Sequence, residues 1–195
     1  MIYKITNNSS VDIAQDLLSK GEMIICPTDT LYGFSVDATN SIAIEKLNIL
    51  KNRISPYSII LDRIDEITKY ASSSSSTLDK IKNILPGPYT VILNKKKGAN
   101  LSKLVTLDLD TIGIRIPNHL FSCKLVEKFK RPIITTSVNL HGSDSLNTID
   151  KIYEAFNKIT IFEDSKSNNN SSGSTIIDFT YNPEKILRVG DGHIN

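Results

Sequence analysis

Residues 23–33 read MIICPTDTLYG, an apolar run that passes directly into proline, hydroxyl and carboxylate side chains. Such a pattern is typical of a buried strand that delivers polar groups to its carboxyl end. In sheets covered by helices, ligands usually bind beyond such strand ends. The alternative is an ordinary surface loop with a turn at Gly33. Residues 27–33 are therefore a candidate site, provided that other polar clusters fold beside them.

The composition is that of a globular protein. The chain has 195 residues, of which 39% are apolar and 23% charged, and this suits one domain over residues 1–195 with its core at about 5–190. No apolar run approaches the roughly 20 residues that a membrane span needs, and the N-terminus lacks a secretory pattern. Two isolated cysteines favour a cytoplasmic location, while a net charge of +2 neither demands nor excludes a polyanionic partner.

Strand-like and helix-like segments alternate along the chain. Strands are expected at residues 23–26, 58–61, 90–93, 111–117, 133–137, 175–179 and 185–189, and residues 159–162 form a further apolar run. Helices are expected near residues 10–20, 43–53, 65–70, 78–85, 125–129 and 149–156. The five serines at 72–76 predict a flexible surface turn. This alternation, followed by a strand-rich end, predicts a single α/β domain whose mixed sheet is flanked by helices.

Two basic residues, Lys51 and Arg53, fall at the end of a helix predicted from the spacing of Ala43, Leu47 and Leu50. Charges at such a position are usually solvated and favoured by the helix dipole. Alternatively, an ammonium point charge and a guanidinium fork suit the phosphates of a nucleotide.

A third basic residue, Arg115, lies in the alternating segment TIGIRIP at 111–117, on the same face as Thr111. A charge inside a strand needs a partner or a ligand unless the strand is at the edge of its sheet. A substrate carboxylate or phosphate would satisfy it. The strand at 133–137 likewise ends in Ser137 and Asn139, where asparagine often only builds a turn.

Common catalytic machinery is absent from the sequence. There is no phosphate-binding GxxxxGK[ST] loop, no GxGxxG turn after a strand and no GxSxG elbow. His119, His141 and His193 lack the spacing of a metal site, so no protein-held metal is expected.

Six motifs in order resemble the YrdC-like family of threonylcarbamoyl-adenylate synthases, from Met23 to Gly190. They are PTDTLYG at 27–33 with KNR at 51–53, LPGPYT at 85–90, GIRIP at 113–117, TSVN at 136–139 with Gly142, STIID at 174–178, and LRVG at 187–190. Any one of these motifs is weak, whereas six in order at compatible spacing are specific.

The resemblance implies a deep cleft over a strongly twisted sheet. It also implies synthesis of threonylcarbamoyl-adenylate and pyrophosphate from L-threonine, bicarbonate and ATP, with Mg²⁺, for tRNA modification by partner proteins. The positions that match threonine-binding residues are Thr30, Arg115, Thr135 and Ser174. Those that match ATP-binding residues are Lys51, Arg53, Thr111, Ser137, Asn139, Ser145 and Arg188, with Lys51 and Arg53 expected to be catalytic.

The chain departs from the family pattern on the nucleotide side. Residues 54–58 read ISPYS where the family has proline and then K-P-L or N-P-L, and histidine replaces serine at 141. A nucleotide- or RNA-binding protein of the same fold that makes no adenylate is therefore the alternative, and a scaffold without a ligand is a third interpretation. The polar segment 165–173, which leads into Ser174, is expected to close over bound ligands or to be only a tolerated insertion.

Overall fold

The computed structural model describes residues 1–140, 142–166 and 170–193. Its strands are β1 (Ile2–Lys4), β2 (Ile24–Cys26), β3 (Gly33–Asp37), β4 (Ser58–Ile60), β5 (Ala71–Ser72), β6 (Tyr89–Lys95), β7 (Thr111–Arg115), β8 (Ile133–Ser137), β9 (Thr160–Glu163), β10 (Thr175–Asp178) and β11 (Lys185–Arg188). Its α-helices are α1 (Ser10–Ser19), α2 (Ser41–Lys51), α3 (Ile67–Tyr70), α4 (Ser75–Lys82), α5 (Leu120–Phe129) and α6 (Ile149–Phe156). Two 3₁₀ turns, Ile64–Glu66 and Lys103–Val105, complete the elements.

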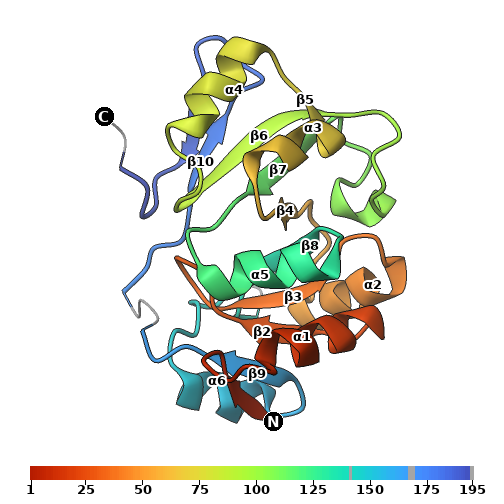
Figure 1. Cartoon of the computed structure of the whole chain (residues 1–195), viewed down its shortest axis with the longest axis vertical. Coiled ribbons are helices and arrows are strands. Elements are labelled where there is room, and N and C mark those ends of the chain that lie inside the picture. The colour runs from red at the N-terminus through yellow and green to blue at the C-terminus, as the bar shows by residue number, and fades with distance from the viewer. Residues whose placement is uncertain (141, 167–169, 194–195) are drawn as a thin grey trace.

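All the strands join one mixed sheet in the order β1-β9-β2-β3-β8-β4-β7-β6-β10-β11, and β5 pairs with β6 at the side. The pairs β1–β9, β2–β9, β4–β7 and β6–β10 are parallel, while the other pairs are antiparallel. In Figure 1, β2 and β3 run across the view and β6 and β10 run obliquely to them, so the sheet twists along its length. The predicted α/β class with a mixed sheet flanked by helices is confirmed.

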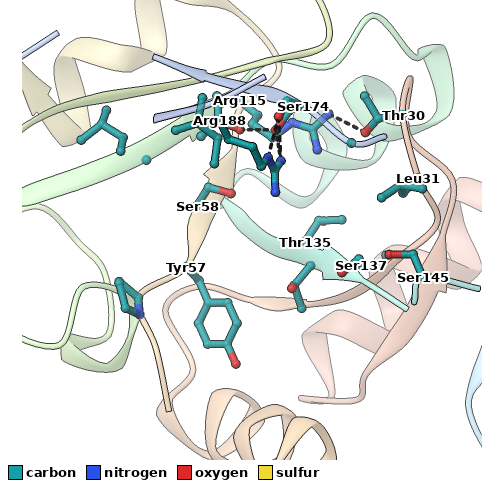
Figure 2. Close-up of a pocket in the computed structure, with 18 of the residues that line it drawn as sticks. Thr30, Leu31, Tyr57, Ser58, Arg115, Thr135, Ser137, Ser145, Ser174 and Arg188 are labelled. Carbon is teal, nitrogen blue, oxygen red and sulfur yellow. Dashed lines mark hydrogen bonds between the residues drawn. The ribbon is translucent and has the colours of Figure 1, made fainter. Parts of the chain in front are cut away.

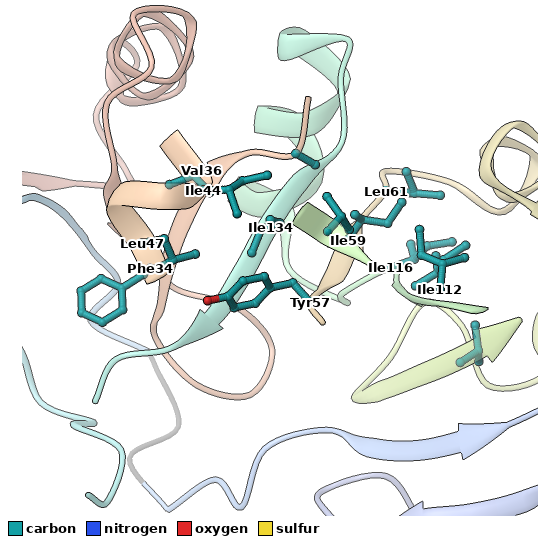
Figure 3. Close-up of a cluster of buried hydrophobic side chains, with 14 of the residues drawn as sticks. Phe34, Val36, Ile44, Leu47, Tyr57, Ile59, Leu61, Ile112, Ile116 and Ile134 are labelled. Carbon is teal, nitrogen blue, oxygen red and sulfur yellow. The ribbon is translucent and has the colours of Figure 1, made fainter. Parts of the chain in front are cut away.

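The two faces of the sheet carry separate apolar clusters. Ile24 and Cys26 of β2 pack with helices α1 and α5, whereas Ile25 between them belongs to the larger cluster on the other face. This alternation follows from the two-residue period of a strand. Figure 1 shows α1 and α5 side by side over one face. Figure 3 shows the larger cluster, which joins α2 to the central strands.

Strand β3 was not predicted. Its sequence GFSVD contains two residues of types that are depleted in strands, Gly33 and Asp37, yet all five positions are buried between β2 and β8. The polar side chains are satisfied there: Ser35 pairs with the Thr135 hydroxyl at 2.9 Å, and Asp37 accepts from the Thr39 main-chain nitrogen at 2.8 Å. Pairing with β2 and β8 and these side-chain hydrogen bonds thus override the weak strand propensity.

The five-serine run is not a flexible turn, so that prediction was wrong. Ser74 caps α4, because its hydroxyl accepts a hydrogen bond from the Thr77 main-chain nitrogen at 3.1 Å. Ser75 and Ser76 form the first turn of the helix. Serine is a preferred capping residue, and a serine-rich stretch before an apolar helix is compatible with a helix start.

None of the helices among the described residues is both long and apolar enough to cross a membrane.

Candidate functional site

A cavity of about 440 Å³ opens over the middle of the sheet. Its walls come from the 27–33 loop, the segment after α2, the end of β8, strands β6, β7 and β10, and Arg188 of β11 (Figure 2). Ten of the eleven residues singled out from the sequence line it: Thr30, Arg53, Thr111, Arg115, Thr135, Ser137, Asn139, Ser145, Ser174 and Arg188. Lys51 does not.

The loop after β2 is shaped by the side chain of Thr28. Its hydroxyl accepts from the Thr30 main-chain nitrogen at 3.1 Å and donates to the Leu31 carbonyl at 2.8 Å. This local bonding substitutes for sheet hydrogen bonds and turns the chain so that Thr30 lines the cavity. Gly33 then starts β3 so close to β8 that a β-carbon there would lie 2.3 Å from the Thr135 methyl group. Only glycine permits this approach.

Arg115 is buried at the end of β7, which lies between β4 and β6, so an edge position does not explain its charge. Its Nη2 donates to the carboxylate of Asp29 at 2.9 Å and to the Thr30 hydroxyl at 3.0 Å. Its Nε is buried and has no hydrogen-bond partner among the described residues. Burial lowers the pKa of Arg115, and Asp29 opposes that shift. The Nε is thus a donor that the described protein groups leave unsatisfied.

Arg188 reaches the same end of the cavity from β11, and Figure 2 shows its side chain beside Arg115 and Ser174. Its Nη2 donates to the carbonyl of Ser174 at 2.7 Å and to the Ser174 hydroxyl at 3.0 Å. The Ser174 hydroxyl also bonds that of Thr90 at 2.7 Å. Burial lowers the pKa of Arg188, and Asp191 opposes the shift. Two guanidinium groups therefore meet at one end of the cavity.

Lys51 lies behind the cavity wall. The side chain is 2% exposed, and its Nζ donates to the Ser137 carbonyl at 2.9 Å and to the amide oxygen of Asn139. Burial, followed by repulsion from Arg53, lowers the pKa of Lys51 to about 8. The solvated helix-end charge that the sequence left open as an alternative is thereby excluded. Lys51 supports two residues that line the cavity.

Arg53 begins the segment that departs from the family pattern. Its Nε is buried without a hydrogen-bond partner in the described part of the chain. Nearby, the Tyr57 ring forms part of the cavity wall, and its hydroxyl donates to the Asn48 amide oxygen at 2.8 Å (Figure 2). Ile54, between Arg53 and Tyr57, is 74% exposed and does not line the cavity. The segment thus presents a guanidinium and an aromatic ring to the cavity.

Sequence reasoning missed Asp29, Tyr57 and Thr90. Asp29 stands inside the PTDT motif, so a signal was present, but nothing in the sequence shows that it pairs with Arg115 86 positions away. His141 and residues 167–169 of the expected closing loop lie outside the described residues. Of that loop, Ser172 and Gly173 line the cavity.

The cavity is suited to anions. Its lining has three guanidinium groups, many hydroxyls and, among the described residues, no carboxylate. No group of histidine, cysteine, aspartate and glutamate in the described part of the chain could hold a metal ion. Guanidinium groups bind carboxylates and phosphates through two-point hydrogen bonds. Such a site can bind an anionic substrate and stabilise negative charge in a reaction, and the described residues that line it include no cysteine, histidine or lysine that could act as a nucleophile.

Comparisons with known proteins agree with this architecture. A sequence model for the Sua5_yciO_yrdC family, described as "Telomere recombination", matches residues 16–190. A protein of Methanocaldococcus jannaschii is 35% identical over 99% of this chain and 92% of its own length. The threonylcarbamoyl-AMP synthase of Pseudoalteromonas translucida is 30% identical over 89% of this chain and 95% of its own.

Two solved structures resemble the chain closely. The structure of P. abyssi Sua5 complexed with L-threonine has a TM-score of 0.88 at 27% identity; the match covers 97% of this chain and 57% of that longer one. The structure of E. coli YciO also has a TM-score of 0.88, at 22% identity, and covers 100% of this chain and 96% of its own. At that identity, the second likeness supports the fold alone.

Proposed function

The chain belongs to the Sua5/YciO/YrdC family, and from that premise we propose that it is a threonylcarbamoyl-AMP synthase. It makes L-threonylcarbamoyladenylate and pyrophosphate from L-threonine, bicarbonate and ATP. The observation that carries the proposal is the cavity lined by Arg53, Arg115 and Arg188 and by hydroxyl side chains, without a carboxylate among the described residues that line it. All three substrates have anionic groups that such a lining can bind.

We assign L-threonine to the end of the cavity at Arg115. The buried guanidinium has an unpartnered Nε, which suits the carboxylate of an amino acid. The hydroxyls of Thr30, Thr135 and Ser174 line the same cavity and supply donors and acceptors for the polar groups of threonine. P. abyssi Sua5 has been crystallised with L-threonine, and this supports the proposal that the present chain also binds L-threonine.

We assign ATP to the part of the cavity that Arg53 and Arg188 line. Their guanidinium groups neutralise phosphate charge, and Thr111, Ser137, Asn139 and Ser145 contribute hydrogen bonds. Lys51 acts from behind by holding Ser137 and Asn139 in place. In this proposal Arg53 touches the nucleotide directly, and Lys51 contributes positive charge and position.

The chemistry needs positioning and charge neutralisation more than a nucleophilic side chain. The threonine amine and bicarbonate form a carbamate and release water. A carbamate oxygen then attacks the α-phosphorus of ATP, and the bond to the leaving pyrophosphate breaks. Both reactants are anionic, so fixed cations lower the repulsion between them and stabilise the charge that develops in the transition state.

Magnesium has no ligand set of its own here. The described residues that line the cavity include no carboxylate, whereas proteins usually bind Mg²⁺ through one or two carboxylates together with substrate phosphates. The residues present therefore do not fit a resident metal ion. We propose that any Mg²⁺ enters bound to the triphosphate, as part of the substrate.

We further propose that the adenylate serves tRNA modification, in which downstream proteins transfer the threonylcarbamoyl group to tRNA. The two free cysteines are compatible with a reducing cytoplasm as the site of this reaction.

The proposal is tested by incubating the purified chain with ATP, labelled L-threonine and bicarbonate and detecting the adenylate by mass spectrometry. Pyrophosphate release should require threonine and bicarbonate together. If ATP turnover is equal without threonine, the proposal fails. If the chain binds nucleotide but forms no adenylate under any condition, the alternative of a binding protein of the same fold is correct.

A further inference from the structure

Asp29 and Arg115 form a buried ion pair next to the cavity. The Arg115 Nη2 lies 2.9 Å from one carboxylate oxygen of Asp29, and the two side chains are 9% and 8% exposed. Of the ion pairs found in the described part of the chain, this is the one in which both partners are so deeply buried. Its position between the 27–33 loop and the end of β7 couples the two segments.

Asp29 itself is not among the residues that line the cavity. One of its oxygens accepts from Arg115 and the other accepts from the Asn118 main-chain nitrogen at 2.9 Å. Both oxygens are thus engaged by protein donors from β7 and from the turn that follows it. Asp29 can therefore act on a ligand through Arg115, or through its neighbour Thr30, and both of these residues line the cavity.

The ion pair determines which nitrogen of the Arg115 guanidinium remains without a hydrogen-bond partner in the described protein. Asp29 and the Thr30 hydroxyl, at 3.0 Å, both accept from Nη2, whereas the buried Nε has no partner among the described residues. A buried donor without a partner is costly, typically about 1–3 kcal/mol. An anionic ligand that accepts from Nε would remove this cost.

Asp29 also stabilises the positive charge of the buried Arg115 side chain. Arg188 lies close enough to disfavour the charge on Arg115, whereas Asp29 and Asp191 favour it, and Asp29 is the stronger of the two. Without Asp29, a buried guanidinium would face a second guanidinium with only Asp191 to balance them. Removing one partner of a buried pair usually leaves the other charge uncompensated.

We infer that Asp29 is a positioning residue for the amino-acid substrate: it holds Nη2 of Arg115, so that the part of the guanidinium that lines the cavity stays aligned with the substrate carboxylate. The inference rests on the proposed function, which supplies the amino acid. Asp29 does not touch the substrate and takes no part in the transfer. Its loss should weaken binding of threonine and leave binding of ATP nearly unchanged.

The test compares Asp29→Asn with the unaltered chain. Binding of L-threonine alone is measured by calorimetry, and steady-state kinetics give KM for threonine, KM for ATP and kcat. We expect Kd and KM for threonine to rise on the order of tenfold or more, because a misplaced guanidinium loses its aligned contact. The KM for ATP should change less than about twofold, because the loss of a charge that does not contact the nucleotide contributes little, as for a surface ion pair.

Two variants separate positioning from folding. Asp29→Glu retains the carboxylate, so it should recover at least part of the threonine affinity that Asp29→Asn loses. Asp37→Asn is the matched control: Asp37 is also a buried carboxylate, paired to Arg131 at 2.7 Å, but it does not line the cavity. Asp37→Asn should lower the melting temperature without changing the threonine Kd. If both aspartate variants raise the threonine Kd equally, Asp29 has only a structural role and the inference is wrong.

A measurement on the unaltered chain covers the case in which Asp29→Asn does not fold. The ¹⁵N-¹H resonance of the Arg115 Nε, assigned with Arg115→Lys, should shift when L-threonine is added. If saturating threonine leaves it unchanged, the inference is wrong.

The outcomes also distinguish the inference from the proposed function. If the unaltered chain makes adenylate but Asp29→Asn folds with the same threonine Kd and KM, the inference alone fails. If the unaltered chain binds threonine in an Asp29-dependent way and makes no adenylate, the proposed function alone fails.

Discussion

The Nζ of Lys51 lies 2.9 Å from the main-chain carbonyl of Ser137, behind the wall of the cavity and not inside it. The same ammonium donates to the amide oxygen of Asn139, whose own amide nitrogen donates to the Ser143 carbonyl at 2.7 Å. The lysine at the end of α2 thus ties the end of β8 and the turn beyond it to the helix. Its charge reaches the cavity through this network.

The pKa of Lys51 predicts a pH-dependent affinity for ATP. Burial lowers this pKa to about 8, so the ammonium loses its proton as the pH rises through that value. We expect the affinity for ATP to fall over the same range, because positive charge near the triphosphate is lost. Calorimetric titrations with ATP between pH 7 and pH 9 measure this. In Lys51→Gln, affinity should be low and flat with pH; an equal decline in this variant would exclude Lys51 as the source.

The same pKa predicts how Lys51 affects stability. The folded-state value of about 8 lies below the ordinary 10.5, so the unfolded chain binds the proton more tightly. Lys51 therefore disfavours the folded state at pH values below about 8, and this cost is relieved as the pH rises from 8 to 10.5. Urea unfolding at several pH values should show a smaller gain in stability over that range for Lys51→Met than for the unaltered chain.

Replacing Lys51 and Arg53 by alanine should have different effects. Lys51→Ala removes a donor from the Ser137 carbonyl and leaves the Asn139 amide oxygen with the Ser137 hydroxyl at 2.8 Å as its donor, so the free energy of unfolding should fall by about 1 kcal/mol. Arg53→Ala removes a side chain whose Nε has no described partner, so stability should change little. Its kcat/KM for ATP should fall about a hundredfold or more if it neutralises phosphate charge. Thermal melts and kinetics on both variants check this, and full activity of Arg53→Ala would contradict it.

Gly33→Ala should disturb both the fold and threonine binding. A β-carbon at this position would lie 2.3 Å from the Thr135 methyl group and 3.1 Å from the Thr136 carbonyl oxygen. The Thr135 side chain must move and β3 must shift slightly away from β8 to accommodate it, at a cost of about 1–3 kcal/mol. Because Thr135 lines the cavity, the KM for threonine should rise as well. Gly98→Ala is the control for threonine binding: nothing lies within 4 Å of a β-carbon there, but the φ of +76° strains an alanine, so this variant should lower the melting temperature without changing the KM for threonine. Equal melting temperatures for Gly33→Ala and the unaltered chain would refute the close approach.

The two cysteines should differ in reactivity. Cys26 is fully buried, its sulfur lies 3.0 Å from the Ser35 hydroxyl, and burial raises the pKa of its thiol to about 11. Cys123 is only partly buried. Because the thiolate is the reactive form, iodoacetamide at pH 8 should label Cys26 only after unfolding in urea, as peptide mass spectrometry would show. Rapid labelling of Cys26 in the folded chain would mean that β2 opens readily.

The predicted strands and helices depended on local patterns, and these were sufficient where burial follows hydrophobic periodicity. The strand at 133–137 is confirmed, and the helix expected near 43–53 is found at Ser41–Lys51, so that Arg53 lies just beyond its end. Strand β3 was missed because its burial depends on partners far along the chain, such as Thr135 for Ser35. The prediction for the serine run was wrong because it relied on the low complexity of the segment and overlooked that a serine, here Ser74, can cap a helix.

The sequence by itself determined the α/β class, the family resemblance and ten residues that meet in one cavity, because motif order and strand ends are properties of the linear chain. Only the tertiary structure decided that Lys51 lies behind the cavity wall and that Asp29 faces Arg115. The physical reason is that burial and the orientation of a charged side chain depend on which segments pack against it. Asp29 and Arg115 are 86 positions apart, and no local pattern specifies that their side chains meet.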